Sequence, residues 1–355
     1  MRSVPAEMHF YMPAEWRRHA ATWLAWPKDP ETWPDRVPQV QEIFVQMMAA
    51  LTPHEVVNLL VDDAATEESV RARCTFSSAA NIHFHQIETV DSWIRDYGPN
   101  FLISDQGTLA FNDWIFNAWG NKYEELKKDD AIPLRLNPIL GAHRFEPQMV
   151  LEGGSIEVNG AGVVLTTEQC LLNPNRNPGL SRSEIEQHLK DYLGVVKVLW
   201  LGEGIVGDDT DGHIDDIARF VNPQTIVCAV EDDPADANYE ILQDNLKRLD
   251  KMTNVNGDAF EIVTLPMPGI VGGESTDNRN LERLPASYAN FYIANGVVLQ
   301  PVFGHANDAR TLQTMQRLFT DRQVVPINCE PLVWGMGTIH CVTQQQPQPS
   351  QNRER

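Results

Sequence analysis

The chain has 355 residues, of which 42% are hydrophobic and 22% are charged, and its formal net charge is −21 at pH 7. This composition supplies ample material for a globular core and excludes a disordered protein. The negative charge opposes a nucleic-acid partner, because a polyanion needs lysine and arginine to neutralise it. It favours a small cationic partner, although a plain solubility surface is the simpler explanation of the charge alone.

No run of 18 or more apolar residues occurs, and the N-terminal segment lacks the apolar stretch of a signal peptide. We therefore expect a cytoplasmic protein with no membrane partner. The cysteines are odd in number and widely spaced, without a CxxC pair, which argues against a disulfide framework. We expect most of them to be reduced and buried. They are Cys74, Cys170, Cys228, Cys329 and Cys341.

Four segments share one pattern, in which two apolar runs of strand length flank a short turn that contains Gly or Asn. This pattern predicts β-hairpins. The hairpins are expected at 95–113, 152–169, 213–233 and 286–304. A fifth unit is split between the ends of the chain, where short apolar strands at 21–27 and 339–345 could pair if the chain closes on itself.

Amphipathic helices are predicted around these hairpins, because apolar residues recur at spacings of three and four. Their ranges are 37–51, 181–193, 238–252 and 307–319, and SRSE at the start of the second is typical of a capping box. Single strands follow at 195–201, 259–265 and 323–328. The repeat predicts one α/β domain over residues 1–347, a five-bladed propeller of ββαβ units closed by the two terminal segments, with a disordered tail at 348–355.

Polar residues fall at the equivalent point of successive units, where each hairpin begins. Asp96 opens the first hairpin, Glu152 the second, His213 and Asp215 the third, and Cys341 the split unit. Equivalent points of a radial array surround one axis, so we expect a single central pocket that holds all five side chains. Taken alone, the cysteine is more simply a packing residue and the histidine a solvated loop residue.

Together these residue types fit chemistry on a guanidinium group. Carboxylates accept forked hydrogen bonds from such a planar cation, and a thiolate can attack its central carbon. A histidine can move protons to the departing ammonia and from the incoming water. We expect no metal, because the 208–216 segment lacks the pattern of a calcium loop and the two histidines of 83–85 have no third ligand.

The chain resembles the agmatine deiminase group of guanidine-modifying enzymes, which includes the bacterial peptidylarginine deiminases. The matching stretches are MPAEWRRHAATWLAWP, DSWIRDYGPNFL, LEGGSIEV, LTTEQCLLNPNRNP, DTDGHIDD and IHCVTQQQP, spread over 12–347. The resemblance implies a pentein fold and cofactor-free hydrolysis of a small cationic guanidino substrate. Agmatine would give N-carbamoylputrescine and ammonia through a thiouronium intermediate on cysteine, in putrescine biosynthesis.

Position by position, the resemblance implies that Cys341 is the nucleophile and His213 the general acid and base. It makes Asp96 and Asp215 the clamps of the guanidinium and Glu152 the acid that supports the histidine.

Two more residues are implied for substrate binding, Trp93 as a wall of the pocket and Asp209 as a partner of the distal amine. The chain departs from the agmatine-specific pattern at GMGT, before the His-Cys pair, and at TDGHIDD, and both departures bear on the distal pocket. Other functions therefore stay open. They are a peptidylarginine or free-arginine deiminase, an amidinotransferase and a non-enzymatic binding propeller. A homo-oligomer is compatible with the sequence.

Overall fold

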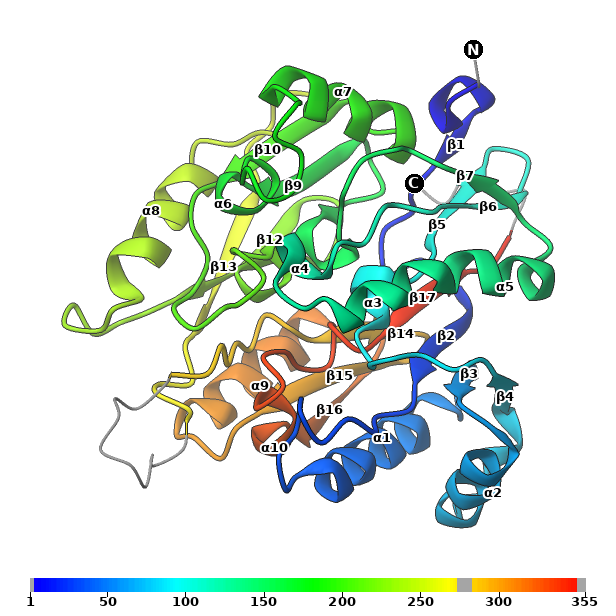
Figure 1. The fold of residues 1–355 in the computed structure, drawn as a ribbon. Helices are drawn as coiled ribbons and strands as arrows, with labels where there is room; N and C mark the ends of the chain where they lie inside the picture. The colour runs from blue at the N-terminus through cyan, green and yellow to red at the C-terminus, as the bar shows by residue number, and fades with distance from the viewer. Residues whose placement is uncertain (1–2, 273–282, 350–355) are drawn as a thin grey trace.

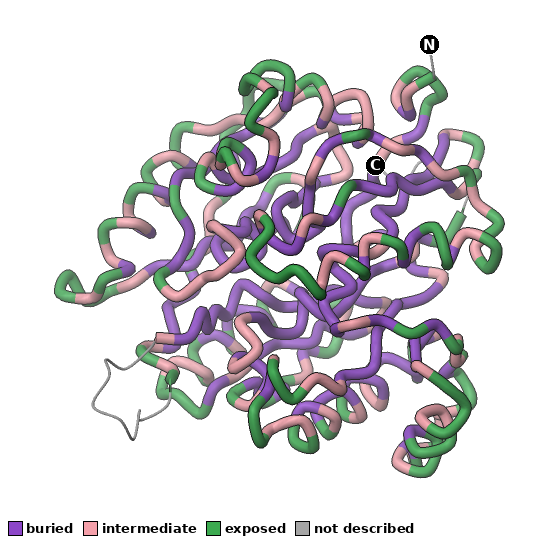
Figure 2. Tube along the Cα trace, viewed as in Figure 1, coloured by how far each residue is buried: buried purple, intermediate pink, exposed green. Residues whose placement is uncertain are grey.

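The protein, seen in a computed structural model that describes residues 3–272 and 283–349, is an α/β fold of small separate sheets with helices around them (Figure 1). The described strands form five sheets, three with three strands and two with four. Figure 2 shows buried strands and loops in the interior and exposed outer faces of the helices. Within the described ranges, no helix is both long and apolar enough to span a bilayer.

Three consecutive sheets share one connectivity, in which an antiparallel hairpin leads through a helix to a third strand parallel to the second. Their elements are β8 (Glu157–Val158), β9 (Val163–Thr167), α7 (Arg182–Leu193) and β10 (Lys197–Leu201); β11 (Ala218–Phe220), β12 (Thr225–Val230), α8 (Tyr239–Leu249) and β13 (Glu261–Pro266); β14 (Tyr292–Ala294), β15 (Val297–Val302), α9 (Asn307–Leu318) and β16 (Gln323–Asn328). The hairpins predicted at 152–169, 213–233 and 286–304, and the single strands after the helices, are confirmed.

The hairpin predicted at 95–113 is also confirmed, as β5 (Asn100–Ser104) and β6 (Leu109–Asn112). Its sheet is completed by β7 (His143–Phe145), parallel to β6, and by β1 (Phe10–Tyr11), antiparallel to β5. The helix before β7, α5 (Ile132–Leu140), was not predicted. Two prolines, Pro133 at its start and Pro138 inside it, conceal its helical pattern, because an interior proline usually breaks a helix.

The two ends of the chain pair as predicted. Strand β17 (Gln344–Pro347) lies antiparallel to β2 (His19–Ala25), and Figure 1 shows the red and blue segments side by side. The same sheet continues through α1 (Val37–Leu51), β3 (Val56–Val61), α2 (Ala64–Arg73) and β4 (Ile82–Gln86), with β2, β3 and β4 parallel.

One detail of the closing segment differs from the prediction of a strand over 339–345. Cys341 lies in a turn, and the strand begins only at Gln344. The turn forms because the Thr343 N–H bonds the His340 carbonyl. The His340 N–H is shared between the backbone carbonyl and the side-chain Oδ1 of Asn290. Beyond Pro349, the predicted disordered tail lies outside the described residues.

The predicted helices form where they were expected. The capping box of α7 is complete, since Ser181 and Glu184 each accept a hydrogen bond from the other's backbone N–H, and Gly194 ends the helix with a φ of 64°. Helix α8 ends at Leu249, short of the predicted residue 252, and a turn follows in which the Met252 N–H donates to the Leu249 carbonyl.

The remaining described elements are short helices of three to seven residues. They are η1 (Pro5–Met8), η2 (Ala79–Asn81), α3 (Ile94–Tyr97), α4 (Ala118–Asn121), η3 (Glu125–Ala131), η4 (Gly153–Ser155), α6 (Glu168–Leu171), η5 (Ile214–Asp216) and α10 (Glu330–Val333).

A fully buried guanidinium joins three of these units. Arg219 of β11 donates through Nε to Glu157 Oε2 of β8 at 2.8 Å, and its NH2 lies 2.9 Å from Glu15 Oε1. Its NH1 donates to the Phe291 carbonyl, next to β14, at 2.7 Å. A buried ion pair becomes strongly destabilising when one partner is removed, since the remaining charge is left unpaired.

Replacing this guanidinium with an apolar chain should therefore lower stability sharply. We expect Arg219→Met to reduce the free energy of unfolding by about 3–5 kcal/mol, because Glu15 and Glu157 stay buried without it. Arg310→Met is the control, because its ion pair with Asp232 is exposed and should contribute about 1 kcal/mol or less. Urea denaturation of both variants measures the difference, and equal losses would contradict the assignment.

Candidate active site

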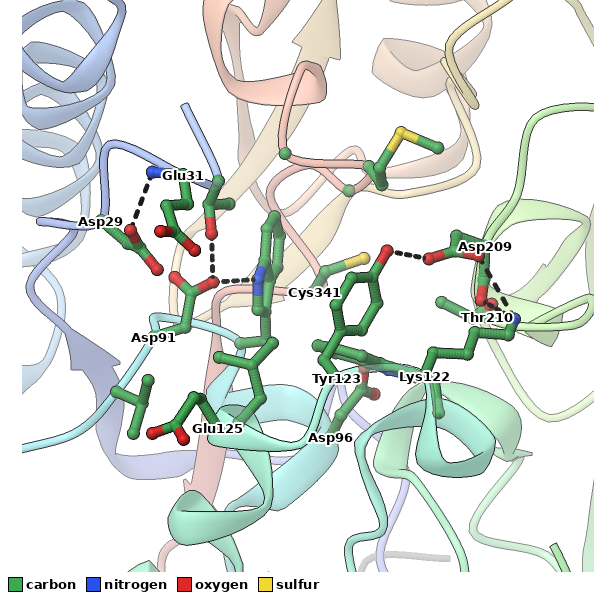
Figure 3. Close-up of a pocket in the computed structure, with 18 of the residues that line it drawn as sticks. Asp29, Glu31, Asp91, Asp96, Lys122, Tyr123, Glu125, Asp209, Thr210 and Cys341 are labelled. Atoms are coloured by element: carbon green, nitrogen blue, oxygen red, sulfur yellow. Dashed lines mark hydrogen bonds and ion pairs between the residues drawn. The ribbon is translucent and has the colours of Figure 1, made fainter. Parts of the chain in front are cut away.

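A cavity of about 590 Å³ is lined by loops from distant parts of the chain (Figure 3). The lining residues fall within 29–32, 90–96, 119–126, 209–210 and 334–341. Four predicted site residues lie on its wall, namely Trp93, Asp96, Asp209 and Cys341. The other three, Glu152, His213 and Asp215, are buried directly beside these, so the prediction that all the catalytic candidates line one cavity is met only in part.

The Cys341 thiol lies at the cavity among carboxylates. Its Sγ is 3.9 Å from Asp215 Oδ2, and it accepts a hydrogen bond of 3.2 Å from Asn290 Nδ2. Burial raises the pKa of this thiol well above its ordinary value, and the carboxylates of Asp215, Asp216 and Asp96 raise it further. The free protein therefore holds a neutral thiol, and a bound cation would favour the thiolate.

Three of the predicted residues converge on the space over one glycine. A Cβ atom built on Gly154 would lie 2.6 Å from His213 Nδ1, 2.9 Å from Asp96 Oδ1 and 3.1 Å from Asp215 Oδ2. No side chain fits there, so the second glycine of the LEGGS stretch is what lets these polar groups meet.

Asp96 is held by two donors. Trp119 Nε1 donates to its Oδ2 at 2.8 Å, and the Gly154 N–H donates to its Oδ1 at 3.0 Å. Burial raises the pKa of Asp96 to about 6, with His213 opposing the shift and Asp215 and Glu152 adding to it. This carboxylate is therefore close to its titration point at neutral pH.

His213 lies 3.7 Å from Asp96, measured between Nδ1 and Oδ1. Burial lowers the pKa of His213, but the Asp96 carboxylate, with Cys170 and Glu152, outweighs burial and raises the pKa well above its ordinary value. The His213 backbone N–H donates to Asp208 Oδ2 at 3.1 Å. Asp208 thus holds the loop and does not face the cavity.

Glu152 is fully buried and paired with Arg176, whose Nε donates to its Oε1 at 2.7 Å. Glu152, Cys170 and His213 also have donor atoms within 4.8 Å of one another, which makes this trio a candidate metal-ligand set among the described residues. The Arg176 guanidinium already supplies the positive charge that Glu152 needs, so the pattern favours an ion pair over a metal site.

Trp93 forms part of the wall, and the GMG loop packs against it. Its indole donates to Asp91 Oδ2 at 2.9 Å. A Cβ on Gly335 or Gly337 would lie within 2.8 Å or 2.7 Å of the Trp93 ring, so both loop residues must be glycine for this packing. Met336 between them has a φ of 72°, which is a strained value for a residue with a side chain.

A second strained loop places Trp119 on Asp96. Ala118, Trp119, Gly120 and Asn121 all have positive φ, at 53°, 52°, 87° and 65°. Such left-handed backbone is costly for residues other than glycine, and here it accompanies a contact to a predicted site residue. Apart from the small residues around Trp119, no local sequence pattern indicates this turn.

Asp209 lies on the cavity wall, as predicted, but its carboxylate already has partners. Lys122 Nζ is 3.3 Å from Asp209 Oδ1, and the Tyr123 hydroxyl donates to Oδ2. Figure 3 shows Lys122, Tyr123 and Asp209 together on one side of Cys341. Lys122 also pairs with Asp211 at 3.0 Å. A distal amine at Asp209 would therefore compete with a lysine of the protein.

Sequence reasoning missed two side chains next to the nucleophile, in addition to the partners of Asp96, Glu152 and Asp209 described above. His340 bonds Asp215 Oδ2 through Nδ1 at 2.7 Å and Glu15 Oε2 through Nε2 at 2.8 Å. Asn290, which contacts the Cys341 sulfur, lies just before β14. This is the position in the fourth unit that corresponds to the predicted residues of the others, so the repeat offered a signal for Asn290 and none for Glu15.

Comparison with known proteins gives consistent matches over the whole chain. The family of Porphyromonas-type peptidyl-arginine deiminases matches residues 11–347. The agmatine deiminase of Pseudomonas aeruginosa strain LESB58 is 38% identical over 365 residues, and that of Stutzerimonas stutzeri strain A1501 is 37% identical over 366 residues. Both alignments cover 98% of each chain. The solved agmatine deiminase of Enterococcus faecalis superposes with a TM-score of 0.90 at 36% identity, again over 98% of each chain.

The space over Gly154 can be tested directly. Gly154→Ala should reduce kcat by about 100-fold or more, because the new methyl group displaces His213, Asp96 and Asp215. Gly179→Ala is the matched control, since a Cβ there meets nothing within 4 Å. Steady-state kinetics with circular dichroism as a folding check would measure this, and wild-type turnover by Gly154→Ala would contradict the geometry.

The raised pKa of Asp96 predicts an acid limb in the pH profile. Above pH 6 the group is ionised and can bind a cation, and as the pH falls through about 6 it takes up a proton and that charge is lost. We expect kcat/KM, which reports the free enzyme, to fall with a midpoint near pH 6. The limb should persist in Asp91→Asn, which removes another carboxylate of the cavity wall, one whose pKa is raised to about 7 by burial. A midpoint below pH 5 would contradict this assignment.

Proposed function

The chain belongs to the Porphyromonas-type peptidyl-arginine deiminase family, and from this premise we propose that it is an agmatine deiminase. It would be a hydrolase that acts on the C–N bond of a linear amidine and releases ammonia. The observation that carries the proposal is the position of a buried thiol and a carboxylate, Cys341 and Asp96, on one cavity, in a chain that matches agmatine deiminases over its full length.

In the proposed reaction, Asp96 and Asp215 bind the guanidinium, and their charge is balanced by the cation. The bound cation favours ionisation of Cys341, whose proton passes to solvent. The thiolate attacks the guanidinium carbon, a C–N bond breaks, and His213 gives a proton to the departing ammonia. His213 then takes a proton from a water molecule, which adds to the same carbon. The C–S bond breaks, the thiolate returns, and N-carbamoylputrescine leaves.

We further propose that the five sheets are the blades of a propeller around this cavity. The support is their connectivity. The candidate residues come just before a strand in each sheet. Asp96, Glu152 and Asp215 precede β5, β8 and β11, the first strands of their hairpins, and Cys341 precedes the closing edge strand β17. A radial array would bring such equivalent points to one axis. A cytoplasmic location, a role in putrescine biosynthesis and a homo-oligomer remain predictions.

Charge on the cavity wall favours agmatine, which carries a second cation and no carboxylate. Besides Asp96 and Asp209, the wall includes Asp29, Glu31, Glu124 and Glu125. An anionic head group would be repelled by this excess of carboxylates.

One observation favours a second candidate, free arginine. Lys122 lies on the cavity wall and could pair with the substrate's carboxylate, just as it now pairs with Asp209.

Turnover of the three candidate substrates by purified protein tests the proposal. We expect kcat/KM to be highest for agmatine, lower for free arginine and lowest for an arginine peptide, measured as ammonia and ureido product. Cys341→Ser should abolish turnover while the fold is kept, because a hydroxyl is a far weaker nucleophile at neutral pH.

Lys122→Met separates the two candidates. If agmatine's amine binds near Asp209, removal of the competing lysine should lower KM for agmatine and leave kcat nearly unchanged. If arginine is the substrate, the same change should raise KM for arginine. Lys247→Met, on the exposed face of α8, controls for the change in net charge. Preference for arginine would overturn the agmatine assignment, and absence of turnover with all three would overturn the deiminase proposal.

A further inference from the structure

We propose that Asn290 is a catalytic residue whose side-chain amide donates a hydrogen bond to the Cys341 sulfur and stabilises it as the attacking thiolate. The proposal rests on thiolate attack, as in the proposed function, and names a group that stabilises the ionised form of the cysteine. Asn290 is fully buried, and its Nδ2 lies 3.2 Å from Cys341 Sγ.

The orientation of this amide is fixed by two other bonds. Asn290 Oδ1 accepts from the Thr338 hydroxyl at 2.7 Å and from the His340 N–H at 3.0 Å. Because the His340 N–H can only donate, the oxygen must face it, and the NH2 group must then face the sulfur. The segment just before the nucleophile thus holds the amide in place, through the Thr338 side chain and the His340 backbone.

The amide can serve both protonation states of the cysteine. As a thiol, Cys341 can donate to Asn290 Oδ1, which lies 3.5 Å from Sγ. As a thiolate it can only accept, and Asn290 Nδ2 is the nearer atom at 3.2 Å. Loss of the proton therefore needs no rearrangement of the surrounding side chains.

The charges around the sulfur explain why a donor is needed there. Burial disfavours the thiolate, and so do the carboxylates of Asp215, Asp216 and Asp96, whereas the Thr338 backbone N–H favours it. The neighbouring histidines are already engaged, His340 with Asp215 and His213 beside Asp96. A lysine or arginine at position 290 would stabilise the thiolate but repel the guanidinium, whereas a neutral amide stabilises the thiolate without this repulsion.

Alkylation of Cys341 by iodoacetamide across a pH series tests the donor without any substrate. In Asn290→Ala we expect alkylation below the thiol pKa to be about 10- to 100-fold slower, since a hydrogen bond to a charged group contributes about 1.5–3 kcal/mol. The rate profile should move to higher pH, which a merely structural role would not produce. Cys341→Ser gives the background from the other four cysteines, which are all buried.

Two further variants separate donation from support of the turn. Asn290→Asp keeps the size and the acceptor oxygen but presents no N–H, so it should shift the profile at least as far as Asn290→Ala. Thr338→Val removes one bond that orients the amide but leaves the donor, so its shift should be much smaller. A wild-type profile in both Asn290 variants, or an equal shift in Thr338→Val, would overturn the proposal. Since no substrate is used, this outcome is independent of whether agmatine is the substrate.

Discussion

The buried carboxylate of Glu15 connects the stability of the fold to the chemistry of the site. It lies 2.9 Å from Arg219 and 2.8 Å from His340, with Arg95 at 3.4 Å. Although burial opposes ionisation, Arg219, His340 and Arg95 together hold the pKa of Glu15 well below its ordinary value. An ionised carboxylate in the interior is stable only with such partners. Because His340 also bonds Asp215, the same network fixes a predicted guanidinium clamp and the residue that precedes the nucleophile.

This arrangement concentrates buried carboxylates around the cavity, and not all of them have a positively charged partner in the protein. The raised pKa values of Asp96 and Cys341 both reflect burial next to other carboxylates. A bound guanidinium would lower the pKa values of both groups, since its positive charge favours the ionised carboxylate and the thiolate. Substrate binding and activation of the nucleophile are therefore coupled by charge, and Asn290 adds a neutral stabilising contact that does not compete with the substrate.

Much of the fold could be predicted from periodicity alone, because the hairpins and amphipathic helices keep their local patterns. Helix α5 could not, since Pro133 and Pro138 hide its pattern. The candidate site was predicted from equivalent positions in the repeat. In the structure, Asp96 and Cys341 from two of these positions line one cavity. Contacts between side chains from distant segments could not be predicted, because no local sequence pattern indicates them. The bond between Glu15 and His340 joins positions far apart in the chain, and the lysine beside Asp209 comes from another loop.

The central claim is that Cys341 carries a covalent intermediate derived from a guanidine. Mass spectrometry of protein quenched in acid during turnover of agmatine measures this directly. The account predicts a peptide containing Cys341 whose mass is increased by that of agmatine less ammonia, and no such peptide in Cys341→Ser. Turnover without any adduct, or an adduct on Cys170 beside His213, would contradict it.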